Sequence, residues 1–154
     1  MAIYVLAFFM GVVAGLRAMT VPAAVSWAAR FGLLNLHGTW LAFLGYAWTP
    51  WILTLLALGE YVTDQLPSTP SRTVPVQFGG RLVTGALAGA ALATSLGGWT
   101  GGALAGAVGA AAGTFGGHAA RGRLAEAFGR DRPAALLEDA IAILAAIAIV
   151  SVAT

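Results

Sequence analysis

The segment EYVTDQLPSTPSRTVPVQFGGR, residues 60–81, lies between two strongly apolar blocks and marks where the chain leaves one helix and enters the next. It holds two carboxylates, two arginines and three prolines, whereas charged residues make up only 9% of the whole sequence. Proline lacks a backbone donor and disfavours helix, so the three prolines predict a polar loop here. We expect the residues that carry function to lie beside this loop.

The composition predicts an all-α integral membrane protein. Of the 154 residues, 59% are hydrophobic, and the 9% that are charged fall far below the roughly 25% of soluble domains. Apolar runs begin at Ile3 and end at Ala153, with only short polar breaks between them. These runs leave no stretch long enough for a separate soluble domain. Residues 1–154 are therefore expected to form a single transmembrane helical domain in the inner membrane.

The charged residues argue against other classes of protein. The arginines fall in short loops between apolar segments, where they are better explained as orientation signals than as a nucleic-acid surface. The sequence has no cysteine, which excludes disulfides, thiol catalysis and cysteine-ligated metals. No positive residue precedes the first apolar run, which continues beyond Arg17, so we expect a first span rather than a cleaved signal.

The apolar runs predict a bundle of five to six transmembrane helices rich in glycine and alanine. The first run, Ile3 to Ala29, is long enough to cross a bilayer, contains Arg17, and is expected to be interrupted near Pro22. Later runs cover residues 51–59, 78–96, 103–117 and 134–153. The segment 33–47 is short: six helices result if it crosses, and five if it only dips into the membrane. We favour six.

Arginine content also predicts the orientation, because cytoplasmic loops carry an excess of positive residues. The loops around Arg72 and around residues 121–132 are therefore expected inside, and the turn at Gly97 outside. With six helices, Arg30 is cytoplasmic and both termini are outside. With five, the N-terminus is inside.

Glycine recurs at helical spacing in two neighbouring runs. The hexapeptide GALAGA occurs at residues 85–90 and again at 102–107. Glycine faces let helices approach closely in lipid, so we expect packing within one subunit, with a homo-oligomer seam or a glycine-lined pore as alternatives. The expected packing positions are Gly85, Gly89, Gly102, Gly106, Gly109, Gly113 and Gly117.

A looser similarity links WAARFG, residues 27–32, with LAEAFG, residues 124–129. Each ends a long apolar segment that is interrupted midway, by Pro22 in the first case and by residues 116–117 in the second. Paired interrupted helices are the sequence pointer to a transporter's binding site. One hypothesis is therefore an internal repeat with two broken helices.

Charged residues from distant parts of the chain fall at the same predicted level of the membrane. Glu60 and Asp64 lie one helical turn apart and share a face. A charge near a helix centre costs about 2.5 to 3.5 kcal/mol, so such groups face inward and pair. We expect a cytoplasm-facing polar site made by Arg17, Glu60, Asp64, Arg72, Arg81, His118, Arg121, Glu138 and Asp139.

Other interpretations stay open for these residues. The charges form a solvated rim with ordinary ion pairs, such as Glu60 or Asp64 with Arg81, if they face outward. His118 is a candidate proton carrier because its side-chain type titrates near neutrality, or it caps a glycine-rich helix end. Arg17 lines the site or extends to the interface where the helix breaks.

Catalysis and metal binding are not predicted. The carboxylates could cluster, but the helical Glu-x-x-His spacing of di-metal bundles is absent. There is no nucleophile elbow and no defensible Ser/His/Asp arrangement. We therefore expect no enzyme, no cofactor, no metal and no nucleic-acid partner.

Several short motifs in a fixed order resemble a known family. They are Gly15-Leu16-Arg17-Ala18, Glu60-x-x-x-Asp64-x-x-Pro67, a glycine-rich span opened by Arg81, the segment His118 to Arg121, and Leu137-Glu138-Asp139. This order resembles the bacterial integral membrane family known only as domain of unknown function 4126. Arg17 departs from it where a smaller polar residue is expected, and Leu82 where proline is expected. The resemblance implies the architecture, the motif positions and a bacterial membrane, but no activity.

Two functions follow as hypotheses. The first is a small transporter or channel-like protein that moves a proton, ion or small solute through the cytoplasm-facing site. The second is a non-transporting scaffold or partner subunit that assembles through its glycine faces. The expected partners are the lipid bilayer, a small ion or solute, and further copies of the chain if the glycine faces form a seam.

Overall fold

A computed structural model describes all 154 residues and confirms that the protein is all-helical, with no strand. The elements are α1 (Ala2–Leu16), α2 (Thr20–Arg30), the short 3₁₀ helix η1 (Ala42–Gly45), α3 (Thr49–Thr63), α4 (Pro75–Thr94), α5 (Trp99–Phe128) and α6 (Asp131–Ala153). Pro50 and Pro75 lie in the first turns of α3 and α4, where proline is tolerated because its missing N–H needs no helical partner.

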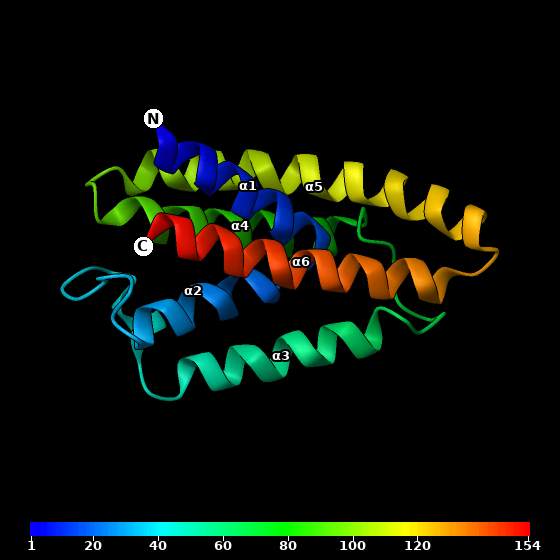
Figure 1. Ribbon diagram of the computed structural model, residues 1–154, viewed down its shortest axis with the longest axis horizontal. Helices are drawn as coiled ribbons and strands as arrows, with labels where there is room; N and C mark the ends of the chain where they lie inside the picture. Colours follow the sequence, from blue (N-terminus) through cyan, green and yellow to red (C-terminus); the bar gives the residue numbers. More distant parts are fainter.

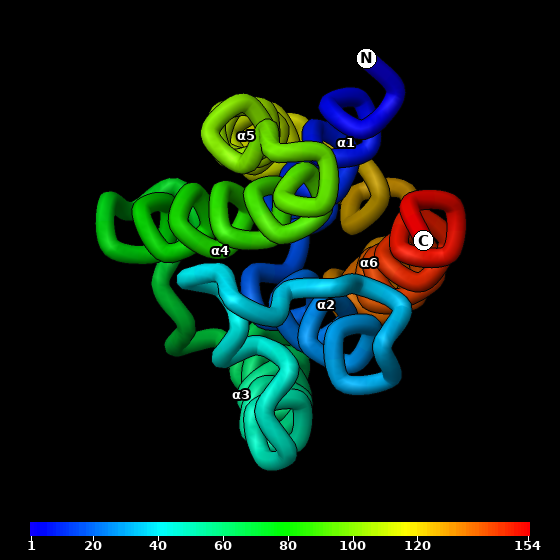
Figure 2. Tube along the Cα trace, turned by 90° about the vertical axis from the view of Figure 1, so that its left-hand side faces the viewer, coloured from blue at the N-terminus to red at the C-terminus, as the bar shows by residue number.

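The helices run back and forth along one long axis, which gives the molecule two distinct ends (Figure 1). One half holds the turn between α5 and α6 at its tip, the loop 64–74, and the break between α1 and α2 near the middle of the long axis, and we call this half the arginine end. The opposite end holds both termini, the segment 31–48 and the turn at Gly97, and we call it the tryptophan end. Figure 2 views the molecule from the tryptophan end.

The first apolar run is interrupted, as predicted, but it does not form one span. Helix α1 ends at Leu16, Arg17 is extended with φ −141° and ψ 106°, and α2 begins at Thr20 and runs back toward the end where α1 started (Figure 1). The break therefore precedes Pro22, which lies in the first turn of α2. The chain forms a helical hairpin with its tip at Arg17, so this residue is placed at the arginine end.

The segment 33–47 does not traverse the bundle. It stays at the tryptophan end, where its only helical part is η1 (Figure 2). The count of six helices and the position of both termini opposite the arginine-rich loops agree with the six-helix prediction, but the sixth helix results from the division of the first run and not from a crossing by 33–47. The five-helix prediction, with the N-terminus at the same end as these loops, is wrong. Arg30 is exposed at the tryptophan end and not at the arginine end, contrary to the prediction for six spans.

Glycine brings α5 into close contact with α1 and α4. A Cβ atom at Gly106 would overlap the carbonyl oxygen of Gly85, and one at Gly102 would overlap that of Gly89. On another side of α5, a Cβ at Gly109 would overlap the carbonyl oxygen of Phe8. Backbone contacts of this kind are possible only without side chains, so these glycine faces pack within the chain.

Helix α5 is continuous over 30 residues and passes through Gly116 and Gly117 without a break. The hypothesis of two interrupted helices related by an internal repeat is therefore wrong, because only the α1–α2 pair is interrupted. Helix α5 ends at Phe128, and Gly129, whose φ of 67° suits glycine, turns the chain into α6.

One helix, α6, is long and apolar enough to cross a membrane. Helix α1 is apolar but has only 15 residues. Between the two ends the core consists of small and medium apolar side chains, such as Met10, Val25 and Leu92, which are fully buried. Charged side chains enter the bundle only at the arginine end.

Candidate functional site

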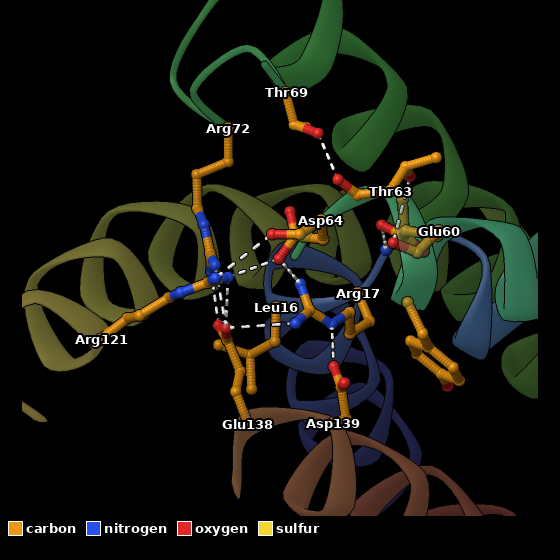
Figure 3. A network of polar contacts seen from close by, with 12 residues as sticks. Leu16, Arg17, Glu60, Thr63, Asp64, Thr69, Arg72, Arg121, Glu138 and Asp139 are labelled. Carbon is orange, nitrogen blue, oxygen red and sulfur yellow. Dashed lines mark hydrogen bonds and ion pairs between the residues drawn. The ribbon is translucent and has the colours of Figure 1, made fainter. Parts of the chain in front are cut away.

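Six charged side chains meet at the arginine end in a connected network, which we call the ionic cluster (Figure 3). They come from the α1–α2 break, the loop after α3, α5 and the start of α6. Its members are Arg17, Asp64, Arg72, Arg121, Glu138 and Asp139. Three guanidinium groups face three carboxylates, so the cluster is balanced in charge.

Arg17 lies at the centre of the ionic cluster and is completely buried. Its guanidinium donates hydrogen bonds to Asp64 and to Asp139, and its Nη2 atom lies 3.6 Å from Oε2 of Glu138. A buried cation is tolerated only when it is paired and hydrogen-bonded. The extended backbone at the hairpin tip leaves the Arg17 side chain between α3 and α6, where Nε and Nη1 are hydrogen-bonded and Nη2 alone has no hydrogen-bond partner.

The carboxylate of Glu138 contacts the guanidinium groups of three arginines, which come from three segments of the chain. Arg72 donates to it bidentately, with Nη1 to Oε1 at 2.5 Å and Nη2 to Oε2 at 2.9 Å. Nη1 of Arg121 lies 3.4 Å from Oε2, and Arg17 completes the set. The bond from Arg72 ties the proline-rich loop to α6.

Arg121 connects the buried cluster with the protein surface. It donates to Asp64 on the inner side, and on the outer side its Nε and Nη2 atoms donate to the two oxygens of Asp131 at 2.9 and 2.6 Å. The Asp131 side chain is 57% exposed. Sequence reasoning missed Asp131, because it falls among several charged residues and only the turn at Gly129 brings it opposite Arg121.

Glu60 and Arg81 lie beside the cluster and form hydrogen bonds with unpaired backbone groups of the two helix ends at the break. The carboxylate of Glu60 accepts the backbone N–H groups of Ala18 at 2.9 Å and Met19 at 2.8 Å. Nη1 of Arg81 donates to the carbonyl oxygens of Gly15 at 2.9 Å and Leu16 at 2.8 Å. Helix ends leave such groups unpaired, so this pair replaces the hydrogen bonds lost at the interruption.

A cleft of about 390 Å³ opens at the arginine end, directly outside the cluster. Most of the residues that line it are polar, and the full set is Asp64, Leu66, Thr69, Pro70, Ser71, Arg72, His118, Arg121, Gly122 and Asp131. The His118 side chain is exposed and makes no hydrogen bond, so neither of its predicted roles is visible in its contacts. The cleft can admit a small polar molecule as far as the arginines.

The network also sets the protonation of Asp64, which lies in the loop directly after α3. Burial alone would raise the pKa of this carboxyl, but the guanidinium groups of Arg17 and Arg121 outweigh burial and hold the pKa below its usual value. Asp64 is therefore ionised across the neutral range.

The structure brings the predicted site residues together. Six of the nine form the ionic cluster, Glu60 and Arg81 hold the break, and His118 lines the cleft. The alternative of a solvated rim fits only the Arg121–Asp131 pair, since the other contacts are buried or half-buried. No group of three or more His, Asp or Glu side chains is arranged to hold a metal ion.

Comparisons with family models, with curated proteins and with solved structures found no match. The class that can be stated is a six-helix protein with one candidate membrane span and a buried ionic cluster beneath an open polar cleft. The resemblance to domain of unknown function 4126 stays a prediction. Any function must be argued from the site.

Proposed function

We propose that this chain is a multi-pass inner-membrane protein that moves a proton, ion or small solute through the cleft and the ionic cluster. The arginine end faces the cytoplasm, and the cluster is the closed inner gate. The observation that carries the proposal is Arg17, a completely buried cation at the tip of an interrupted helix beneath an open cleft. Ionisable groups within membrane bundles mark ion and substrate paths.

Exposed apolar side chains support the membrane part of the proposal. Large apolar residues on the outer faces of five helices are at least half exposed: Phe9, Leu55, Val83, Leu104 and Leu144. Faces of this extent are stable in contact with lipid and unfavourable in water. The helix break also fits a bilayer, because backbone groups there must find partners inside the protein, and Glu60 and Arg81 supply partners for four of them.

The two ends of the molecule support the orientation. Every arginine except Arg30 belongs to the arginine end, as positive residues of cytoplasmic loops do. The opposite end carries aromatic pairs, Trp40 with Trp99 and Trp27 with Trp51, whose ring centroids lie 5.5 and 4.9 Å apart. Tryptophan is enriched at membrane interfaces.

The packing supports a gated path rather than an open channel. Between the cluster and the tryptophan end, the interior is filled with residues such as Met10, Val21 and Leu92. Transport therefore requires the helices to separate, and the interrupted α1–α2 hairpin is the element whose break can absorb such a movement.

Flux through reconstituted protein tests the proposal. Liposomes containing the wild-type chain are assayed for proton, sodium, potassium and phosphate movement and compared with Asp64→Asn, which removes the charge shared by Arg17 and Arg121. We expect wild-type flux of one of these species and a loss of about tenfold or more in the variant. Glu126→Gln, an exposed acid outside the network, is the matched control. Absence of wild-type flux, or equal flux in Asp64→Asn, contradicts the proposal.

The alternative of a scaffold that assembles through glycine faces has less support. The glycines of that face on α5 are engaged by α1 and α4, so a partner would have to displace one of these helices. A scaffold role would need another surface.

A further inference from the structure

We propose that the cleft binds a small oxyanion, with a phosphate group as the test case, in the place that the Asp131 carboxylate occupies on Arg121. This inference rests on the proposed function, because it names the chemical class of the solute that the same site accepts. The phosphate group can belong to a free solute or to a lipid headgroup, since both present the same oxygens to the arginine.

The geometry of Arg121 carries the inference. Its Nε and Nη2 atoms point outward as a fork and donate to the two Asp131 oxygens at 2.9 and 2.6 Å. This parallel arrangement is the one by which guanidinium groups recognise carboxylates and phosphates. Asp131 therefore holds the position of an external oxyanion.

Exposure makes Asp131 the exchangeable partner. Its side chain is 57% exposed at the mouth of the cleft, whereas the inner partners Asp64 and Glu138 are 15% and 8% exposed and are each held by more than one guanidinium. An incoming oxyanion can displace Asp131 and leave the ionic cluster intact. The exchange preserves the charge next to Arg121, because one anion replaces another.

Other hydrogen-bond donors lie around the same position. The Arg72 guanidinium lies next to that of Arg121, where both reach Glu138 (Figure 3). His118 and Ser71 line the cleft, and the imidazole makes no hydrogen bond. A tetrahedral oxyanion has oxygens left over after it binds the Arg121 fork, and these side chains can donate to them.

The charge around the mouth favours anions. Five of the six acids pair with arginines, which leaves Glu126 as the only acid outside these pairs. Three exposed arginines at this end, Arg123, Arg130 and Arg132, face that single acid. The other five acids pair with four arginines, so this end holds seven arginines against six acids and carries a net charge of +1. Arg130 and Arg132 line a second hollow that shares Leu66 and Asp131 with the cleft. A positive surrounding steers anions toward such a mouth.

Equilibrium binding of inorganic phosphate to the full chain in micelles of a maltoside detergent, which carries no phosphate group, tests the site. Asp131→Asn removes the internal competitor, and we expect phosphate to bind about tenfold more tightly than to the wild type. Arg121→Lys keeps the charge but loses the fork, and we expect binding about tenfold weaker. Glu126→Gln changes the net charge of this end as Asp131→Asn does, but lies outside the cleft, so its affinity should stay close to that of the wild type.

Addition of phosphatidylglycerol to these micelles distinguishes the two sources of phosphate. Competition by this lipid against inorganic phosphate, lost in Arg121→Lys, supports the site and identifies a headgroup as the ligand, whereas absence of competition supports a free solute. An equal gain in Asp131→Asn and Glu126→Gln, or no gain in Asp131→Asn, overturns the inference. Binding without flux would contradict transport alone, and flux of a cation without phosphate binding would contradict the oxyanion site alone.

Discussion

The carboxylate of Glu60 and the guanidinium of Arg81 lie 3.7 Å apart, and each contacts one of the two helix ends at the break. Arg81 binds the carbonyl end of α1, and Glu60 binds the amide end of α2. Each charge therefore matches the partial charge of the helix end that it contacts. The pair stabilises the hairpin, and this function differs from solute binding.

This relationship changes what is expected of Glu60. Glu60→Gln keeps hydrogen-bonding atoms but removes the charge at the start of α2, so we predict a destabilisation of about 1 to 3 kcal/mol. Thermal unfolding in detergent measures it, with Glu126→Gln as the control that loses an exposed acid outside the network. An unchanged unfolding temperature in Glu60→Gln would show that the break does not depend on this carboxylate.

Arg17 should be the most sensitive position of the ionic cluster. Arg17→Met preserves much of the side-chain volume but leaves Asp64 and Asp139 without their buried cation, so a loss of about 3 to 5 kcal/mol is expected. The double variant Arg17→Met with Asp139→Asn should recover part of this loss, because one of the two stranded charges is gone. Chemical unfolding of the two variants measures the recovery, and an additive double variant would show that the two residues do not interact.

Acid should weaken the network through Asp64. Because the folded pKa of Asp64 lies below its unfolded value of about 3.9, its charge contributes fully above that pH and the contribution is lost as the pH falls through the folded pKa. We predict that the wild type is more stable than Asp64→Asn between pH 5 and 7, and that the difference shrinks below about pH 4. Unfolding temperatures over this range provide the check. A difference in unfolding temperature that does not vary with pH would contradict the prediction that the charge of Asp64 stabilises the fold.

Glycine at the α4–α5 contact should tolerate no side chain. Gly106→Ala places a methyl group on the backbone of Gly85, so we expect a loss of about 1 to 3 kcal/mol. Gly116→Ala is the matched control on the same helix, because no atom outside the helix lies within 4 Å of its Cβ position, and it should be neutral or stabilising by up to about 1 kcal/mol. Folded yield and unfolding temperature in detergent measure both variants, and equal effects would exclude close packing at Gly106.

Much of this arrangement could be predicted from the sequence, and its limits have physical causes. Apolar composition and glycine spacing are local properties, so the helices and the packing positions could be read from them. The reversal at Arg17 could not, because an apolar run has the same pattern whether it continues or folds back. The groups that cap the break, Glu60 and Arg81, are distant in the chain. Asp131 was missed for a similar reason, since its pairing with Arg121 depends on the turn at Gly129.

Blocking the cleft chemically tests most directly whether the solute passes through it. The chain has no native cysteine, so Ser71→Cys, which lines the cleft, and Ser95→Cys, which is exposed at the opposite end, provide two nearly isosteric single labelling sites. We predict that a bulky membrane-impermeant maleimide abolishes flux in Ser71→Cys liposomes when applied to the side that the arginine end faces, and leaves flux in Ser95→Cys unchanged from either side. Full flux through completely labelled Ser71→Cys protein would contradict the assignment of the cleft and the ionic cluster as the transport path.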